Sequence, residues 1–263
     1  MGTTRSAVSR GVFSVERGLE MIRFVQSEEE KRALLRLCEK TAFGCKISTI
    51  ARAYGFDKSF ACFWLDWDEN VVYCLVDGVM LLSGTVLDGE GSRQFLHMVG
   101  AGEILCAVRN AEALKLKPLA KGDVLKRKVE SGPVPPMPSA SVNIREIYAL
   151  LSQEGMVGEF EPFYLDLSHK LRHQAACALT VPWKDGICGC AVVSSISEGS
   201  AILSALAVQK EYLRHGLGTK LVRKMESYFP GKTMYVFREQ NKNREFYRGL
   251  GYVKTDTWVH GTL

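Results

Sequence analysis

Residues 202–225 read ILSALAVQKEYLRHGLGTKLVRKM and decide the fold of the second half of the chain. The run that ends at Val208 is mostly apolar, which predicts a buried strand. A polar loop follows, and Gly216 and Gly218 then stand where a helix begins. The next apolar residues recur at helical spacing, which predicts a helix with one face packed on a sheet. These residues are Leu217, Leu221, Val222, Met225 and Tyr228.

The start of this helix has the chemistry of an anion site. Backbone N–H groups of a first helical turn lack intrahelical partners, and the helix dipole places partial positive charge there. Glycines at this position let a phosphate approach the backbone closely. The spacing is not the Rossmann fingerprint, because Leu221 occupies the third glycine position, nor a P-loop, because Thr219-Lys220 has the wrong order. Basic side chains surround the same loop: Lys210, Arg214, His215, Lys220, Arg223 and Lys224.

Two segments in this order resemble the GCN5-related N-acetyltransferase (GNAT) family. They are residues 203–222, LSALAVQKEYLRHGLGTKLV, and residues 235–258, YVFREQNKNREFYRGLGYVKTDTW. The resemblance spans roughly residues 143–258. It implies an α/β (α+β) fold, with a mixed central sheet flanked by helices. It also implies acetyl-CoA as the cosubstrate and direct acetyl transfer to an amine.

By position, the resemblance also assigns a donor site. The end of the strand would hydrogen-bond the pantetheine arm as if adding a strand, and the glycine loop would bind the diphosphate through backbone N–H groups. Asn243 would contact the pantetheine or the phosphates. The expected cofactor-binding residues are Leu206, Ala207, Val208, Arg214, His215, Gly216, Leu217, Gly218, Thr219 and Asn243.

Two catalytic roles follow from the same resemblance. Tyr247 stands where many members of the family place the tyrosine that protonates the departing thiolate; the alternative is a helix tyrosine that packs beside Phe246. The N–H of Val208, at an expected bulge in its strand, is the candidate donor to the oxyanion. Such a donor contributes about 3–4 kcal/mol in comparable sites.

The chain departs from the family pattern at three positions. Leu213 stands where the loop usually opens with Gln or Arg, and Gln240 stands where Asn is usual. Ala205 replaces a frequent carboxylate, so the general base is unidentified. Glu159, Glu161, Glu198 or a chain of waters are the candidates. These departures leave an alternative function, a non-catalytic acyl-CoA-binding sensor or regulatory protein.

Composition excludes several other classes. The 263 residues are 46% hydrophobic and 24% charged, with a net charge of +5, as expected of a soluble globular protein. No uncharged apolar run of about 18 residues occurs, and no dense basic stripe, so neither a membrane nor a nucleic acid is an expected partner. We expect a cytoplasmic monomer or homodimer that acts on a small-molecule or peptide amine. The eight cysteines lie mostly in apolar runs, which predicts reduced, buried thiols and no metal site.

A proline-rich segment divides the chain. Residues 131–138 read SGPVPPMP, and neither a helix nor a central strand can cross them. We therefore predict a polar leader at 1–20, a smaller α/β domain at 21–130, a linker at 131–141 and a GNAT-like domain at 142–263.

The first half carries fewer signals. The Asp77-Gly78 dipeptide between apolar runs predicts a hairpin. Gly100-Ala-Gly102 precedes a strand instead of opening a helix, so no second phosphate loop and only one CoA site are expected. This half is either a degenerate acetyltransferase-like copy or an unrelated α/β domain.

Overall fold

The computed structural model describes residues 22–138, 142–184, 186–240 and 242–263. The leader expected at residues 1–20 therefore lies outside the described residues. The chain forms two compact units. The first comprises residues up to Ile47, Gly55–Lys121 and Thr257–Leu263, and the second comprises Ser48–Tyr54 and Gly122–Asp256.

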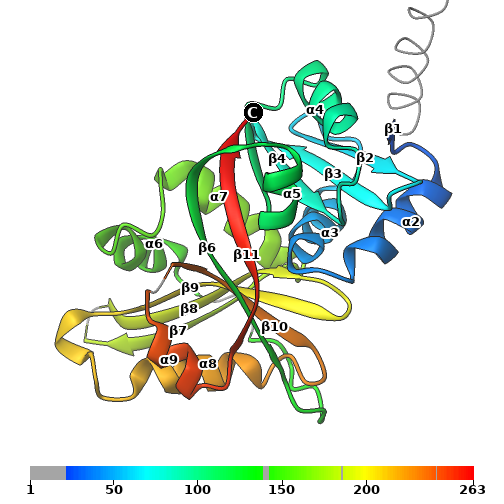
Figure 1. Ribbon diagram of the computed structural model, residues 1–263. Helices are drawn as coiled ribbons and strands as arrows, with labels where there is room; N and C mark the ends of the chain where they lie inside the picture. The colour runs from blue at the N-terminus through cyan, green and yellow to red at the C-terminus, as the bar shows by residue number, and fades with distance from the viewer. Residues whose placement is uncertain (1–21, 139–141, 185, 241) are drawn as a thin grey trace, which may run out of the picture. The chain divides into compact units, whose positions relative to one another are not determined.

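The second unit is a mixed sheet with helices on both faces. Its strands pair in the order β6-β10-β9-β8-β7, and β10 runs parallel to β9 but antiparallel to β6. Helices α6 and α7 pack on one face, and α8 and α9 pack on the other (Figure 1). The elements of the second half of the chain are α6 (Ile144–Gln153), α7 (Phe160–Arg172), β7 (Cys177–Trp183), β8 (Gly186–Ile196), β9 (Ser200–Val208), the 3₁₀ turn η1 (Lys210–Tyr212), α8 (Leu217–Glu226), β10 (Thr233–Glu239), α9 (Arg244–Gly249) and β11 (Val253–Thr262).

The first unit has its own sheet and core. Strands β1 to β5 pair in chain order, and the end of β11 pairs antiparallel with β5. Its core surrounds the fully buried Tyr73, Phe95 and Leu96. The elements of the first half of the chain are β1 (Ile22–Phe24), α2 (Glu28–Cys38), α3 (Ala42–Tyr54), β2 (Ala61–Asp66), β3 (Val71–Val76), β4 (Val79–Ser83), α4 (Gly89–Met98), β5 (Glu103–Ala107), α5 (Val108–Ala113) and β6 (Lys117–Lys128).

The two halves of the chain repeat one order of elements. Apart from β1 in the first half and the turn η1 in the second, each has two helices, a three-stranded antiparallel meander, a helix, a strand parallel to the third meander strand, a short helix and a final strand. The parallel pair is β4 with β5 in the first half and β9 with β10 in the second. The repeat favours the duplicated-copy interpretation of the first half.

The final strand of each half pairs in the other unit. Residues of β6 from Gly122 onward pair with β10, whereas the last residues of β11 pair with β5. Apart from Ser48–Tyr54, the division between the units therefore falls at Lys121/Gly122 and Asp256/Thr257, and the proline-rich residues 131–138 lie within the second unit. The simple expected boundaries at 130 and 142 do not coincide with it, because strand exchange is not visible in local composition.

Two elements were not predicted from the sequence. Helix α3 begins after Thr41, whose hydroxyl accepts a hydrogen bond from Gly44 N at 2.8 Å. Strand β6 is rich in lysine and has a buried stretch only around Val124 and Leu125, so it lacks the alternation of a half-buried strand.

Candidate functional site

The parallel strands β9 and β10 separate after a short ladder. They pair only at Thr233–Tyr235 with Ser200–Ile202, although β9 continues to Val208 and β10 to Glu239. From Leu203 onward, the edge of β9 that faces β10 is therefore not paired with β10. The two strands therefore form a V that opens toward the loop before α8.

A bulge lies at the closed end of this V. Along the pairing of β8 with β9, Val192 faces Ala205 and Val193 faces Leu203, so Ser204 is the extra residue. Ser204 is exposed in mid-strand, and its hydroxyl donates to Val192 O at 3.0 Å. The bulge expected at Val208 is wrong, because Val208 pairs in register with Gly189. Serine at an apolar strand position was the one available signal, and sequence reasoning missed it.

The loop after β9 ends in the predicted helix start. Gly216 is the N-cap of α8 with φ +75° and ψ 5°, a left-handed conformation that favours glycine. No side chain caps this helix among the described residues, and the first intrahelical bond runs from Lys220 N to Gly216 O at 3.0 Å. The N–H groups of Leu217, Gly218 and Thr219 precede that bond, so the helix does not use them.

Basic residues and the end of β9 adjoin these amides. Arg214 and His215 are exposed, and Arg214 also has a left-handed φ of +64°. A Cβ placed on Gly218 would lie 3.5 Å from the Phe246 ring and 3.9 Å from Leu206. The loop, α9 and the edge of β9 thus meet at Gly218. Asn243 is the exposed residue directly before α9, with φ +55°.

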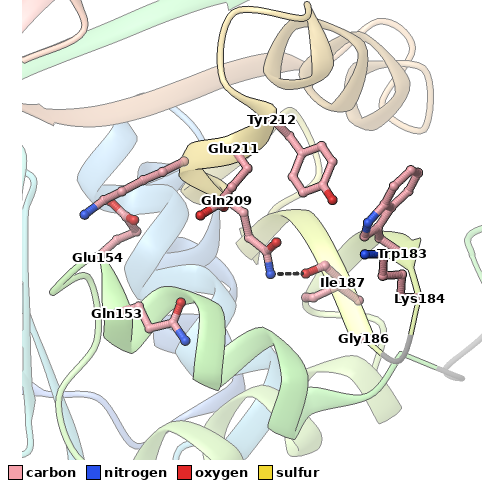
Figure 2. Close-up of a pocket in the computed structure, with 10 residues that line it drawn as sticks. Gln153, Glu154, Trp183, Lys184, Gly186, Ile187, Gln209, Glu211 and Tyr212 are labelled. Atoms are coloured by element: carbon pink, nitrogen blue, oxygen red, sulfur yellow. Dashed lines mark hydrogen bonds between the residues drawn. The ribbon is translucent and has the colours of Figure 1, made fainter.

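A cavity of about 720 Å³ borders the same loop, and Figure 2 shows the residues that line it. The rings of Trp183 and Tyr212 form one wall, with centroids 5.2 Å apart. Gln209 fixes the loop where β9 ends: its N donates to Cys188 O and its Nε2 donates to Ile187 O, both at 2.9 Å. These bonds set the position from which the loop turns toward Gly216.

Tyr247 lies on α9 and is buried against the sheet. Its ring contacts Phe246 and Tyr252 edge-on, with centroids 5.1 and 5.7 Å apart. Burial raises the pKa of Tyr247 to about 12, and the nearby positive charge of Arg238 opposes that rise. The hydroxyl is therefore protonated at neutral pH and can donate a hydrogen bond.

Arg238 belongs to a buried ion pair that the sequence did not indicate. Its guanidinium bonds the carboxylate of Asp123 on the adjacent strand β6, and both side chains are less than a tenth exposed. Lys254 Nζ lies 2.7 Å from the other oxygen of Asp123. Burial alone would raise the pKa of Asp123, but Lys254 and Arg238 hold it below its ordinary value.

The candidate general bases lie in different places. Glu159 and Glu161 are exposed at the start of α7. Glu198 lies in the turn before β9, at the opposite end of that strand from Val208, and its carboxylate is 3.8 Å from Arg52. Glu198 is therefore remote from the helix start. No cluster of three or more potential metal-ligating side chains occurs in the described residues, and none of their helices has the length and apolarity to span a bilayer.

An open parallel strand pair followed by a glycine loop and an uncapped helix defines an α/β domain that can bind an anionic, strand-like ligand. Residues 144–252 match the model of the Acetyltransferase (GNAT) family, so the second half of the chain is a domain of that family. No curated protein sequence matches the chain.

Solved structures extend the likeness to the first half. A GCN5-related N-acetyltransferase from Sphaerobacter thermophilus has a TM-score of 0.58 at 12% identity, covering 92% of this chain and 95% of its own. A tandem GNAT protein from the clavulanic acid biosynthesis pathway has a TM-score of 0.55 at 14% identity, with 92% and 98% covered. A GNAT-family acetyltransferase from Colwellia psychrerythraea has a TM-score of 0.52 at 12% identity, covering 92% of this chain and 99% of its own. At such low identities the structural likeness shows the fold alone, and its coverage includes both halves.

Proposed function

We propose that this protein is an acetyl-CoA-dependent N-acetyltransferase that transfers the acetyl group directly to an amine. The observation that carries the proposal is the open V between β9 and β10 leading to the uncapped start of α8. A strand-like arm with a diphosphate at one end matches both features.

The direction of the donor follows from this geometry. A diphosphate at the amides of Leu217, Gly218 and Thr219 places the pantetheine along the free edge of β9, which runs back toward the closed end of the V. From Val208 to Ser204 this edge is about 13 Å long at the usual rise per residue. The thioester would therefore lie near the Ser204 bulge instead of at Val208.

Backbone N–H groups around this bulge are better placed than that of Val208 to stabilise an oxyanion. A residue at a bulge is released from regular ladder pairing, which leaves its backbone groups available. Val208 keeps its expected place as a contact to the pantetheine arm.

Tyr247 would stabilise the leaving group. The amine nitrogen attacks the thioester carbon, the C–S bond breaks, and the sulfur leaves with the electron pair. With a pKa of about 12, Tyr247 holds its proton more tightly than a free thiol, whose pKa is about 8.5. The hydroxyl therefore stabilises the developing thiolate as a hydrogen-bond donor. The amine loses one proton and the thiolate takes up one, so the products are an amide and the thiol of CoA.

A direct assay tests the proposal. Purified protein is mixed with acetyl-CoA and a panel of polyamines, amino acids, aminoglycosides and peptides with free N-termini, and release of CoA is followed. We expect release that depends on one class of amine. Tight acetyl-CoA binding without turnover on any amine would instead favour the acyl-CoA sensor.

A further inference from the structure

A second cavity in the same unit, of about 420 Å³, is lined by an excess of cations. Of the nine described residues that line it, four are basic and one, Asp123, is acidic. Asp123 is already engaged by Arg238 and Lys254. The basic residues are Arg238, Arg244, Arg248 and Lys254.

Two of these cations lie on successive turns of α9. Arg244 and Arg248 are four residues apart, so they lie on one side of the helix, where like charges repel. Arg248 pairs with Glu245, which does not line the cavity. Arg244 has no ion-pair partner within the described part of the chain. The arrangement leaves net positive charge facing the cavity.

This cavity lies on a different side of α9 from the glycine loop. Phe246 faces Gly218 at the start of α8, since a Cβ placed on Gly218 would lie 3.5 Å from the Phe246 ring. Arg244 and Arg248 are each two residues from Phe246, which turns them about 200° away from it. A ligand in this cavity therefore need not compete with one at the amides of α8.

We propose that this cavity binds the phosphate group of a small molecule other than the acetyl donor. Guanidinium groups offer several N–H donors in a planar fork that matches phosphate oxygens. Arg244 and Arg248 would hold the phosphate from α9, and Lys254 would hold it from β11. The volume is within the range of small-molecule sites, so an organic part of the ligand fits beside the phosphate.

Arg238 links this site to the proposed chemistry. Its positive charge opposes the rise in the pKa of Tyr247, and Arg238 is one of the residues that line the cavity. An anion there would partly neutralise the cations around Tyr247. This link rests on the proposed function, whereas the phosphate site itself does not.

The test uses inorganic phosphate as the probe and the full chain. Thermal unfolding is followed as phosphate is added, against sodium chloride at equal ionic strength, with and without saturating CoA. Wild type is compared with Arg244→Gln/Arg248→Gln, whose changed side chains are exposed, and with the control Arg172→Gln on α7.

We expect phosphate to raise the unfolding temperature of wild type and of Arg172→Gln. The double variant should bind phosphate at least about tenfold more weakly, since each lost charged hydrogen bond weakens binding. Saturating CoA should leave the phosphate effect in place. Equal phosphate binding by the double variant, or loss of the effect with CoA, would overturn the proposal. Failure of CoA to bind would refute the proposed function while leaving the phosphate result readable.

Discussion

Asp88 and Gly216 hold equivalent places in the two halves of the chain, each as the N-cap of the helix after the third meander strand. The Asp88 carboxylate caps its helix by accepting a hydrogen bond from Gly91 N at 2.9 Å. Glu69 accepts from Leu87 N and Asp88 N at 2.8 and 2.6 Å. The start of α4 is thus occupied by the protein's own acids, whereas the start of α8 is open.

This difference predicts one donor site per chain. Two carboxylates at the start of α4 would repel a diphosphate, although both halves share one order of elements. Titration calorimetry with acetyl-CoA should give one equivalent bound per chain. Two equivalents would show that the first half also binds the donor.

The charge of a side chain introduced at position 216 should decide the affinity for acetyl-CoA. Asp and Asn have nearly the same shape, and both tolerate the left-handed φ of this position better than other side chains. Gly216→Asp should bind acetyl-CoA at least about tenfold more weakly than Gly216→Asn, because the carboxylate would face the diphosphate. Equal affinities of the two variants, measured by calorimetry, would argue against a diphosphate at this loop.

Removal of the Tyr247 hydroxyl should affect turnover more than binding. Tyr247→Phe is expected to lower kcat by about 10²-fold or more while the Kd for acetyl-CoA stays close to that of wild type. Tyr252→Phe is the matched control, since Tyr252 is also buried and its ring contacts Tyr247. Parallel losses in kcat and affinity, or equal effects of the two variants, would indicate packing instead of catalysis.

A large side chain at Ser204 should separate CoA binding from acetyl transfer. Ser204 is exposed, so Ser204→Phe should fold, but the ring would occupy the space assigned to the acetyl group. We expect Ser204→Phe to lose most turnover and to keep its affinity for CoA, while Ser204→Ala keeps both. Full turnover by Ser204→Phe in steady-state assays would place the thioester elsewhere.

The Asp123–Arg238 pair should contribute to stability in a pH-dependent way. Asp123→Asn leaves the buried guanidinium without its counter-charge and should lower the free energy of unfolding by about 3 kcal/mol at pH 7. The pKa of Asp123 in the folded state is below its ordinary value of 3.8. The stabilisation is therefore complete above that value and is lost as the pH falls through the folded-state pKa.

Urea unfolding of wild type and Asp123→Asn at pH 7 and at pH values below 4 checks this expectation. The difference between the two proteins should shrink in acid. Lys254→Gln serves as the control, because the Lys254 side chain is about half exposed and should contribute less than about 1 kcal/mol. An unchanged difference at both pH values would contradict the assignment.

Local signals in the sequence predicted the strand, loop and helix that form the candidate site. Apolar periodicity and glycine placement suffice for β9, the loop and α8, because those features lie within one short segment. Ser27 and the three glutamates that follow it are a similar local signal, because Ser27 and Glu30 form a capping box at the start of α2.

Features that depend on distant pairing could not be predicted. The bulge at Ser204 follows from the register of β8 against β9. The Asp123–Arg238 pair joins residues 115 positions apart, and it forms only because β6 pairs with β10. The exchange of β6 and β11 has the same origin, since neither strand carries a local sign of its partner.

The central claim is that main-chain amides at the start of α8 bind the donor diphosphate, and a crystal structure with bound CoA tests it most directly. We predict diphosphate oxygens about 3 Å from the backbone nitrogens of Leu217, Gly218 and Thr219, with the pantetheine between β9 and β10. A diphosphate bound elsewhere, with these N–H groups directed away from it, would contradict the claim.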